Sequence, residues 1–160
     1  MAARSSRSPG VLVVVPCGRS KVWDKEPSAG ATAARDAYRG APFKVNREYA
    51  ESFADPGDQW VILSAKYGFL PPDFLIPGPY EVTFAQRSSG PVGMETLRQQ
   101  VQQQHLDQFR TIIGLGGKEY RAAIEAAFSD TAADLQFPFA GLPIGKAMQA
   151  TKSGTRNRQG

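Results

Sequence analysis

The chain has 160 residues, a length that suits one domain able to bury a hydrophobic core without disulfides or a structural metal. Hydrophobic residues make up 41% and charged residues 21%, which is typical of a globular protein and excludes a disordered chain. A single cysteine excludes an intramolecular disulfide and a cysteine-based zinc site, and a single histidine excludes most histidine-rich metal centres. We therefore expect no metal and no cofactor.

The net charge of +4 is concentrated at the two ends of the chain. Residues 1–10 and 151–160 hold five basic residues and no acidic one, whereas the 14 basic residues between them are outnumbered by 15 acidic ones. We expect both ends to be disordered basic tails around a single α/β domain over residues 11–150. Such tails attract nucleic acid without regard to its sequence, or simply keep a protein in solution.

Membrane insertion is not expected. The longest apolar run, Val11 to Val15, is far shorter than the ~20 residues that span a bilayer. Pro9 and Gly10 interrupt the N-terminal segment before the hydrophobic region of a signal peptide could form. The sequence therefore predicts a cytoplasmic location, and it does not specify an oligomeric state.

Four apolar segments predict strands, and helical patterns separate them. Strands are expected at Val11–Val15, Trp60–Leu63, Thr111–Leu115 and Ala133–Phe137. Helices are expected at Ala31–Arg39, Phe43–Phe53, Met94–Phe109, Lys118–Phe128 and residues 141–150. The proline-rich residues 69–91 exclude a long helix or a central strand there. This alternation predicts an α/β fold, a three-layer sandwich with a mostly parallel central sheet.

Glycines and basic residues follow the expected strands, at the edge where ligands bind in open parallel sheets. The candidates for binding a nucleotide or phosphate are Cys17, Gly18, Arg19, Lys21, Ser64, Lys66, Tyr67, Gly68, Gly117, Lys118 and Lys146. Glycines allow close approach of the backbone, and a cation in every loop favours an anionic ligand such as phosphate. The alternative is that these glycines serve turn geometry alone and that the cations are ordinary surface residues.

The segment from Ser64 to Tyr80, SAKYGFLPPDFLIPGPY, is the most distinctive in the chain. The ring of Tyr67 could stack on a base, and Tyr80 could donate a hydrogen bond to a base or phosphate, or simply pack. Two acids, Asp73 and Glu81, follow stiff proline-containing stretches and are the candidate catalytic carboxylates. Asp73 is the first choice, although an Asp after prolines commonly caps a helix instead.

Several segments together resemble a bacterial family of uncharacterised domains related to the YaaA-type peroxide stress proteins. The resemblance rests on VLVVVPCGRSK, the Arg35–Tyr38 stretch, the Phe43–Tyr49 helix, WVILSAKYGFLPPDFLIPGPYEVT and GGKEY. It implies DNA binding and protection from oxidative damage. The sheet pattern is also similar to the uracil-DNA-glycosylase-like α/β fold. The Asp-Pro-Tyr and His-Pro-Ser motifs of classical glycosylases are absent, which argues against a standard uracil glycosylase.

These observations lead to the hypothesis of a DNA-directed enzyme, a DNA glycosylase that removes a modified or damaged base by N-glycosidic hydrolysis. The flipped base would stack on Tyr67, and the basic loop residues would hold phosphates. Asp73 or Glu81 would stabilise the developing sugar cation. The main alternative is a non-enzymatic stress-response protein that binds DNA or a nucleotide. A redox or transfer enzyme that uses Cys17 and a nucleotide hydrolase are further alternatives, and the latter lacks the clustered acids of a Mg²⁺ site.

Overall fold

The computed structural model describes residues 10–159. Its central sheet has five strands in the order β4-β3-β1-β6-β7. The strands are β1 (Val11–Pro16), β3 (Gln59–Ser64), β4 (Gly68–Leu70), β6 (Thr111–Gly114) and β7 (Asp134–Gln136). All neighbours pair in parallel except β3 and β4, which are antiparallel. The expected mixed α/β fold with a mostly parallel sheet is confirmed, and each predicted strand lies within one or two residues of its predicted bounds.

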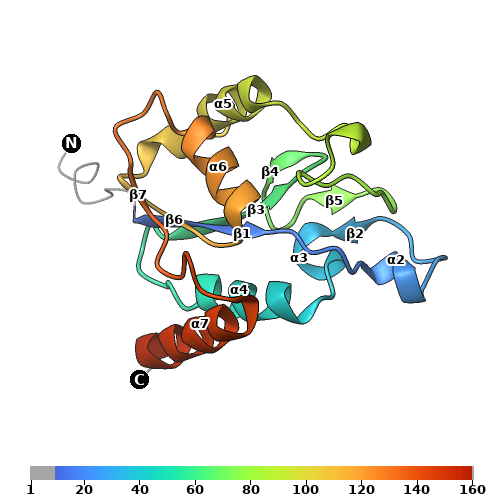
Figure 1. Cartoon of the computed structure of the whole chain (residues 1–160), viewed down its shortest axis with the longest axis horizontal. Helices are drawn as coiled ribbons and strands as arrows, with labels where there is room; N and C mark the ends of the chain where they lie inside the picture. Colours follow the sequence, from blue (N-terminus) through green and yellow to red (C-terminus); the bar gives the residue numbers. More distant parts are fainter. Residues whose placement is uncertain (1–9, 160) are drawn as a thin grey trace.

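Helices cover both faces of this sheet (Figure 1). The helices α5 (Met94–Gln103) and α6 (Lys118–Ala127) lie on one face, and α4 (Ala41–Glu51) and α7 (Ile144–Gln159) lie on the other. Shorter elements lie beyond one end of the sheet or join the helices: α2 (Val22–Lys25), β2 (Thr32–Ala33), α3 (Ala34–Ala37), β5 (Leu75–Ile76), η1 (Arg87–Ser89) and η2 (Leu106–Gln108). None of the helices in residues 10–159 is long and apolar enough to cross a membrane.

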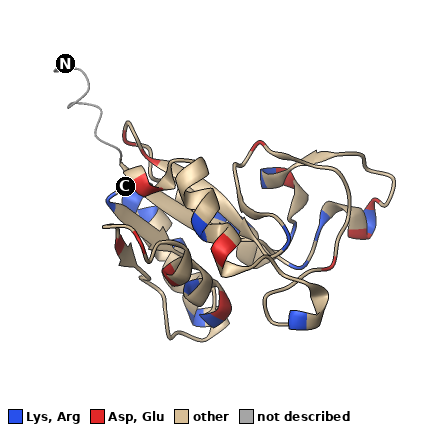
Figure 2. Cartoon of the chain, turned by 90° about the horizontal axis from the view of Figure 1, so that it is seen from above, with Lys and Arg blue, Asp and Glu red and all other residues tan. Residues whose placement is uncertain are grey.

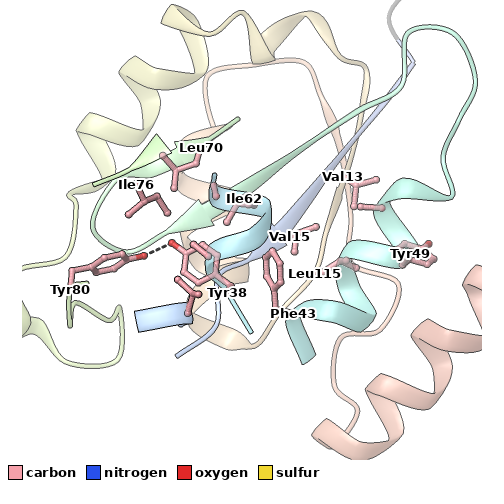
Figure 3. Packing of buried hydrophobic residues seen from close by; sticks show 14 of the residues in the cluster. Val13, Val15, Tyr38, Phe43, Tyr49, Ile62, Leu70, Ile76, Tyr80 and Leu115 are labelled. Carbon is pink, nitrogen blue, oxygen red and sulfur yellow. Dashed lines mark hydrogen bonds between the residues drawn. The ribbon is translucent and has the colours of Figure 1, made fainter. Parts of the chain in front are cut away.

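The central strand β1 explains this architecture, because it is buried on both faces. Leu12 and Val14 contact the core under α5 and α6, whereas Val13 and Val15 contact the core on the α4 side. Burying a large aliphatic side chain contributes about 1.5–3 kcal/mol, so an unbroken β-branched run is most stable in the middle of a covered sheet. Figure 3 shows the core on the α4 side. It continues from Val13 and Val15 through Phe43 to the Tyr38–Tyr80 pair, beyond the end of the sheet.

Two predicted helices differ from the structure. The Ala31–Arg39 segment forms only β2 and the single turn α3, because residues 32 and 33 pair with β5 instead. The Met94–Phe109 helix ends as α5 at Gln103, because His105 adopts a left-handed conformation with φ of 58° and begins a new turn at η2. His105 is consequently exposed.

The predicted basic tail at residues 151–160 is wrong for residues 151–159, which belong to helix α7. Small residues allow α7 to pack closely on α4. Thr151 is buried and donates a hydrogen bond to the Ala147 carbonyl oxygen at 2.6 Å, and Gly154 lies against the ring of Tyr49. The Arg158 guanidinium stacks 3.4 Å from the centroid of the Phe53 ring. The other predicted tail, residues 1–10, lies outside the described residues except for Gly10.

Glutamine side chains from α5 and from the residue that follows it cover the edge strand β4. Gln100 accepts a hydrogen bond from the Phe69 amide at 2.8 Å and donates one to the Tyr67 carbonyl oxygen at 2.9 Å, and Gln104 donates one to the Phe69 carbonyl oxygen at 2.9 Å. An unpaired edge strand would otherwise invite association with another chain. Gly68 allows this contact, because a Cβ there would lie 2.1 Å from the Gln100 amide oxygen.

Gly68→Ala should therefore destabilise the fold more than Gly90→Ala does. Both glycines have φ of 78°, so both substitutions incur the left-handed penalty of about 1–2 kcal/mol. Only Gly68 has a neighbour that a methyl group would displace, and we expect an extra loss of at least about 1 kcal/mol there. Urea unfolding of both variants measures the difference. Equal losses would show that Gln100 does not hold β4.

Gly154→Ala and Gly145→Ala test the docking of α7. Nothing lies within 4 Å of a Cβ at Gly145. Gly145→Ala should therefore stabilise the protein by up to about 1 kcal/mol, because alanine lowers the conformational entropy of the unfolded chain. A Cβ at Gly154 would approach the Tyr49 ring to 2.8 Å, and this buried ring is flanked by Phe53 and Phe139. We expect Gly154→Ala to lower the free energy of unfolding. A gain equal to that of Gly145→Ala would contradict the packed helix.

Candidate functional site

The strand order creates a switch point between β1 and β6. After β1 the chain crosses to β3 on one side, whereas after β6 it continues to β7 on the other side. Helices therefore leave the carboxyl ends of β1 and β6 toward opposite faces, and a crevice opens between these ends. Cys17 follows β1 and Leu115–Gly117 follow β6, so these residues border the crevice.

A pocket of about 530 Å³, here called the cation pocket, opens beyond the carboxyl end of β1. Six of the residues predicted from the sequence line it: Cys17, Gly18, Arg19, Lys21, Tyr80 and Glu81. Four further polar residues, which were not predicted from the sequence, also line it: Asp24, Thr83, Gln86 and Tyr120. The structure thus brings the loop after β1 together with the proline-rich segment, which is about 60 residues later in the chain.

The charged groups of the cation pocket are available to a ligand. The Lys21 ammonium lies 4.5 Å from the centroid of the Tyr80 ring and donates to the Arg19 carbonyl oxygen at 3.1 Å. Within residues 10–159, no carboxylate lies within 4.0 Å of a side-chain nitrogen of Arg19 or Lys21, and no basic group lies that close to Glu81. Asp24 instead accepts a hydrogen bond from the Lys21 amide at 2.9 Å, so its position is structural.

Three buried hydroxyl groups hold the pocket wall in place. The Tyr80 hydroxyl bonds to the Tyr38 hydroxyl (Figure 3). It also lies 3.0 Å from the Ser64 hydroxyl. Ser64 also accepts the amides of Lys66 and Tyr67 at 3.1 and 3.2 Å. Burial raises the pKa of Tyr38 and Tyr80 far above the usual tyrosine range, so both remain neutral hydrogen-bonding groups. Ser64 was expected to bind the ligand, but it is fully buried and therefore supports the site from within.

Cys17 and Tyr120 form a second fixed pair at the crevice. The Cys17 sulfur lies 3.3 Å from the Tyr120 hydroxyl, which donates to the Cys17 carbonyl oxygen at 3.2 Å. Burial, and then the proximity of Cys17, raise the pKa of Tyr120 well above its usual value. Tyr120 therefore stays protonated and joins the end of β1 to the first turn of α6. One sequence signal could have identified Tyr120: it lies two residues after the start of a helix that follows a strand.

The second predicted loop does not line the cation pocket. Tyr67 packs against Phe74 and Tyr80, with ring centroids 5.8 and 5.4 Å away. The exposed Lys66 ammonium lies 5.4 Å from the Tyr80 ring centroid. Gly68 is buried against Gln100 and is not a ligand-binding glycine. This loop packs against the Tyr80 ring outside the cation pocket, and the expectation that a base stacks on the half-buried Tyr67 stays a prediction.

The two predicted carboxylates occupy different surroundings. Glu81 lines the cation pocket, whereas Asp73 lies on an exposed turn and does not line it. Asp73 belongs to the turn in which the Phe74 amide donates to the Pro71 carbonyl oxygen, and this turn packs near α3 rather than at the sheet edge. The first choice of catalytic carboxylate therefore passes from Asp73 to Glu81.

The remaining predicted residues lie elsewhere. Gly117 lines a neighbouring pocket, and Lys118 and Lys146 are exposed in the first turns of α6 and α7 without lining the cation pocket. Not all of the predicted cations therefore converge on one ligand. Among the described residues, no group of three or more His, Cys, Asp or Glu side chains could hold a metal ion.

Comparisons with known proteins agree with an uncharacterised bacterial family. The chain is 39% identical over 119 residues to the uncharacterised protein YfjM of Bacillus subtilis strain 168, which covers 74% of this chain and 77% of that protein. A crystal structure of AF0587, a protein of unknown function, aligns with 89% of this chain and 43% of its own length, at a TM-score of 0.42 and 11% identity. The chain thus spans less than half of that protein. Residues 12–153 match the family of unknown function DUF6884, and the chain belongs to this family.

Proposed function

We propose that the protein is a DNA-directed N-glycosidic hydrolase that releases a modified or damaged base, with Glu81 as its catalytic carboxylate. The observation that carries this proposal is that Glu81, Arg19 and Lys21 line one pocket at the carboxyl edge of the sheet, and that neither cation has an ion-pair partner within residues 10–159. A volume of about 530 Å³ lies in the usual range for small-ligand sites.

The cations account for phosphate binding. Arg19 offers a planar fork of donors that matches phosphate oxygens, and Lys21 adds a point charge beside it. Figure 2 shows basic and acidic residues interspersed over the fold, in keeping with the excess of acids between the two ends of the chain. Phosphate recognition by this pocket would therefore be local and would not depend on a broad basic face.

Glu81 supplies the charge that glycosidic cleavage needs. In this hydrolysis the bond between C1′ of the sugar and the base nitrogen breaks, water adds to C1′, and a proton goes to the departing base. The sugar carries positive charge in the transition state, and a fixed carboxylate stabilises that charge and orients the water. The Tyr80 hydroxyl network immobilises the preceding residue, so the backbone of Glu81 is positioned before a ligand binds.

The resemblance to YaaA-type peroxide stress proteins and to the uracil-DNA-glycosylase-like fold supports DNA as the substrate, because both imply work on damaged DNA. A non-enzymatic role in binding DNA or a nucleotide is the second candidate. It is favoured by the position of Asp73, since only one of the two expected carboxylates lines the pocket.

Glu81→Gln should abolish base release while Asp73→Asn leaves it unchanged. Both substitutions keep the size of the side chain and remove one charge, but only Glu81 lines the pocket. We expect a loss of at least about 10²-fold for Glu81→Gln. The assay incubates duplexes with a panel of modified bases and cleaves abasic sites with alkali. Unchanged activity of Glu81→Gln would contradict the proposed role, and a wild-type protein that binds the duplexes but releases no base would favour the binding protein.

Arg19→Ala should weaken DNA binding about tenfold, and Arg110→Ala should not. Arg110 precedes β6, so it lies at the opposite edge of the sheet and serves as a matched control. Loss of one phosphate contact should also lower the slope of log affinity against log salt concentration by about one. Fluorescence anisotropy of a labelled duplex between 50 and 200 mM salt measures both quantities. Equal losses in the two variants would place the DNA elsewhere.

A further inference from the structure

A second pocket lies directly beside the cation pocket. This apolar pocket, of about 420 Å³, is bordered by Leu115, Phe139, Leu142, Ile144 and Met148. It is lined by residues of α4, α6 and α7 and by the loop that follows β6. Cys17 and Tyr120 line both pockets, so this hydrogen-bonded pair stands where the two adjoin.

The two pockets have opposite chemistry. The cation pocket contains four charged side chains, whereas the apolar pocket contains only one, Arg121. That arginine donates to the Gly116 carbonyl oxygen at 3.2 Å, and the Thr151 hydroxyl is likewise used within the chain, on Ala147. Asn46 also lines the apolar pocket. Within residues 10–159 its side-chain amide makes no hydrogen bond, and the residue is half-buried.

The rim of the apolar pocket exposes more apolar surface than a folded protein needs to. Ile144, the first residue of α7, is 72% exposed, and Leu142 is 43% exposed. An aromatic ring, Tyr120, forms the wall toward the cation pocket. Apolar walls, an aromatic side chain and one free amide are the groups that recognise a planar heterocycle, by stacking and by hydrogen bonds to its edge.

We propose that the apolar pocket receives the nucleobase of the same nucleotide whose phosphate binds Arg19 and Lys21, with the sugar beside Cys17 and Tyr120. A nucleotide is a ligand with one apolar planar end and one anionic end, and the two adjoining pockets offer these two environments. This inference rests on the proposed function and assigns the base site to Asn46 and Tyr120 in place of Tyr67. It requires that base recognition and phosphate recognition be separable by mutation.

Binding of nucleosides and of ribose 5-phosphate to the whole chain tests this separation. Nucleosides have no phosphate and should depend on the apolar pocket, whereas ribose 5-phosphate has no base and should depend on the cation pocket. We expect Asn46→Leu to weaken binding of the best nucleoside about tenfold, through loss of the amide hydrogen bonds. Arg19→Ala should leave nucleoside binding unchanged and weaken ribose 5-phosphate about tenfold. Isothermal titration with the common nucleosides and their 2′-deoxy forms provides the measurements.

Asn157→Leu is the matched control, because Asn157 is exposed on the last turns of α7 and lines neither pocket. If thermal unfolding shows that Asn46→Leu does not fold, Ile144→Gln replaces it, since that side chain is mostly exposed and its loss should not affect folding. A several-fold loss of nucleoside binding is then expected.

Two negative results are distinguishable. If ribose 5-phosphate binds through Arg19 but no nucleoside binds, or Asn46→Leu and Asn157→Leu have equal nucleoside affinity, the base site is overturned and the proposed function stands. If neither ribose 5-phosphate nor duplex DNA binds in an Arg19-dependent way, the proposed function fails, and the inference fails with it.

Discussion

The burial of β1 on both faces is the constraint on which the rest of this structure depends. Leu12 and Val14 require apolar cover on one face of the sheet, and Val13 and Val15 require it on the other. Neighbouring parallel strands must also satisfy both edges of β1, which β3 and β6 do. Because the chain leaves β1 and β6 toward opposite sides, the switch point is a consequence of this arrangement. The crevice with Cys17 at its border therefore lies at the carboxyl end of the strand that occupies the centre of the core.

Buried hydroxyl groups fix the position of the loops beyond the sheet. Tyr38, Ser64 and Tyr80 come from three separate segments, and the hydrogen bonds that join them are buried. Breaking such a bond would leave a buried polar group unsatisfied and would lower the free energy of unfolding. Together they fasten the proline-rich segment to the loop after β3. Glu81 is exposed and does not belong to the core, and it reaches the cation pocket because its neighbour Tyr80 is held there. The rigidity that a catalytic carboxylate needs would thus come from the packing of its neighbour.

Much of the fold could be predicted from the sequence, but less of the candidate site could be. The β-branched run of β1 and the apolar periodicity of α4 and α6 are local signals, and they identified these elements closely. Local signals failed where a tertiary contact prevailed. Residues 32 and 33 pair with β5, His105 turns the chain out of α5, and the Gly-containing end of α7 packs on Tyr49 although its composition resembles a tail. Tyr120 was missed because its contact with Cys17 spans 103 positions in sequence.

The amino-acid sequence was enough to predict the four parallel strands β1, β3, β6 and β7, the class of the fold and the basic, glycine-containing loops after these strands, because each of these depends on residues that are close together in the chain. Which members of those loops share a pocket depends on tertiary packing. Arg19, Lys21 and Glu81 line the same pocket, whereas Asp73, Lys118 and Lys146 do not, and Tyr67 is turned into the packing behind Tyr80. The position of a loop residue depends on how the buried groups beside it pack. The contacts of these buried groups join segments that are far apart in the chain, and sequence periodicity cannot relate such segments.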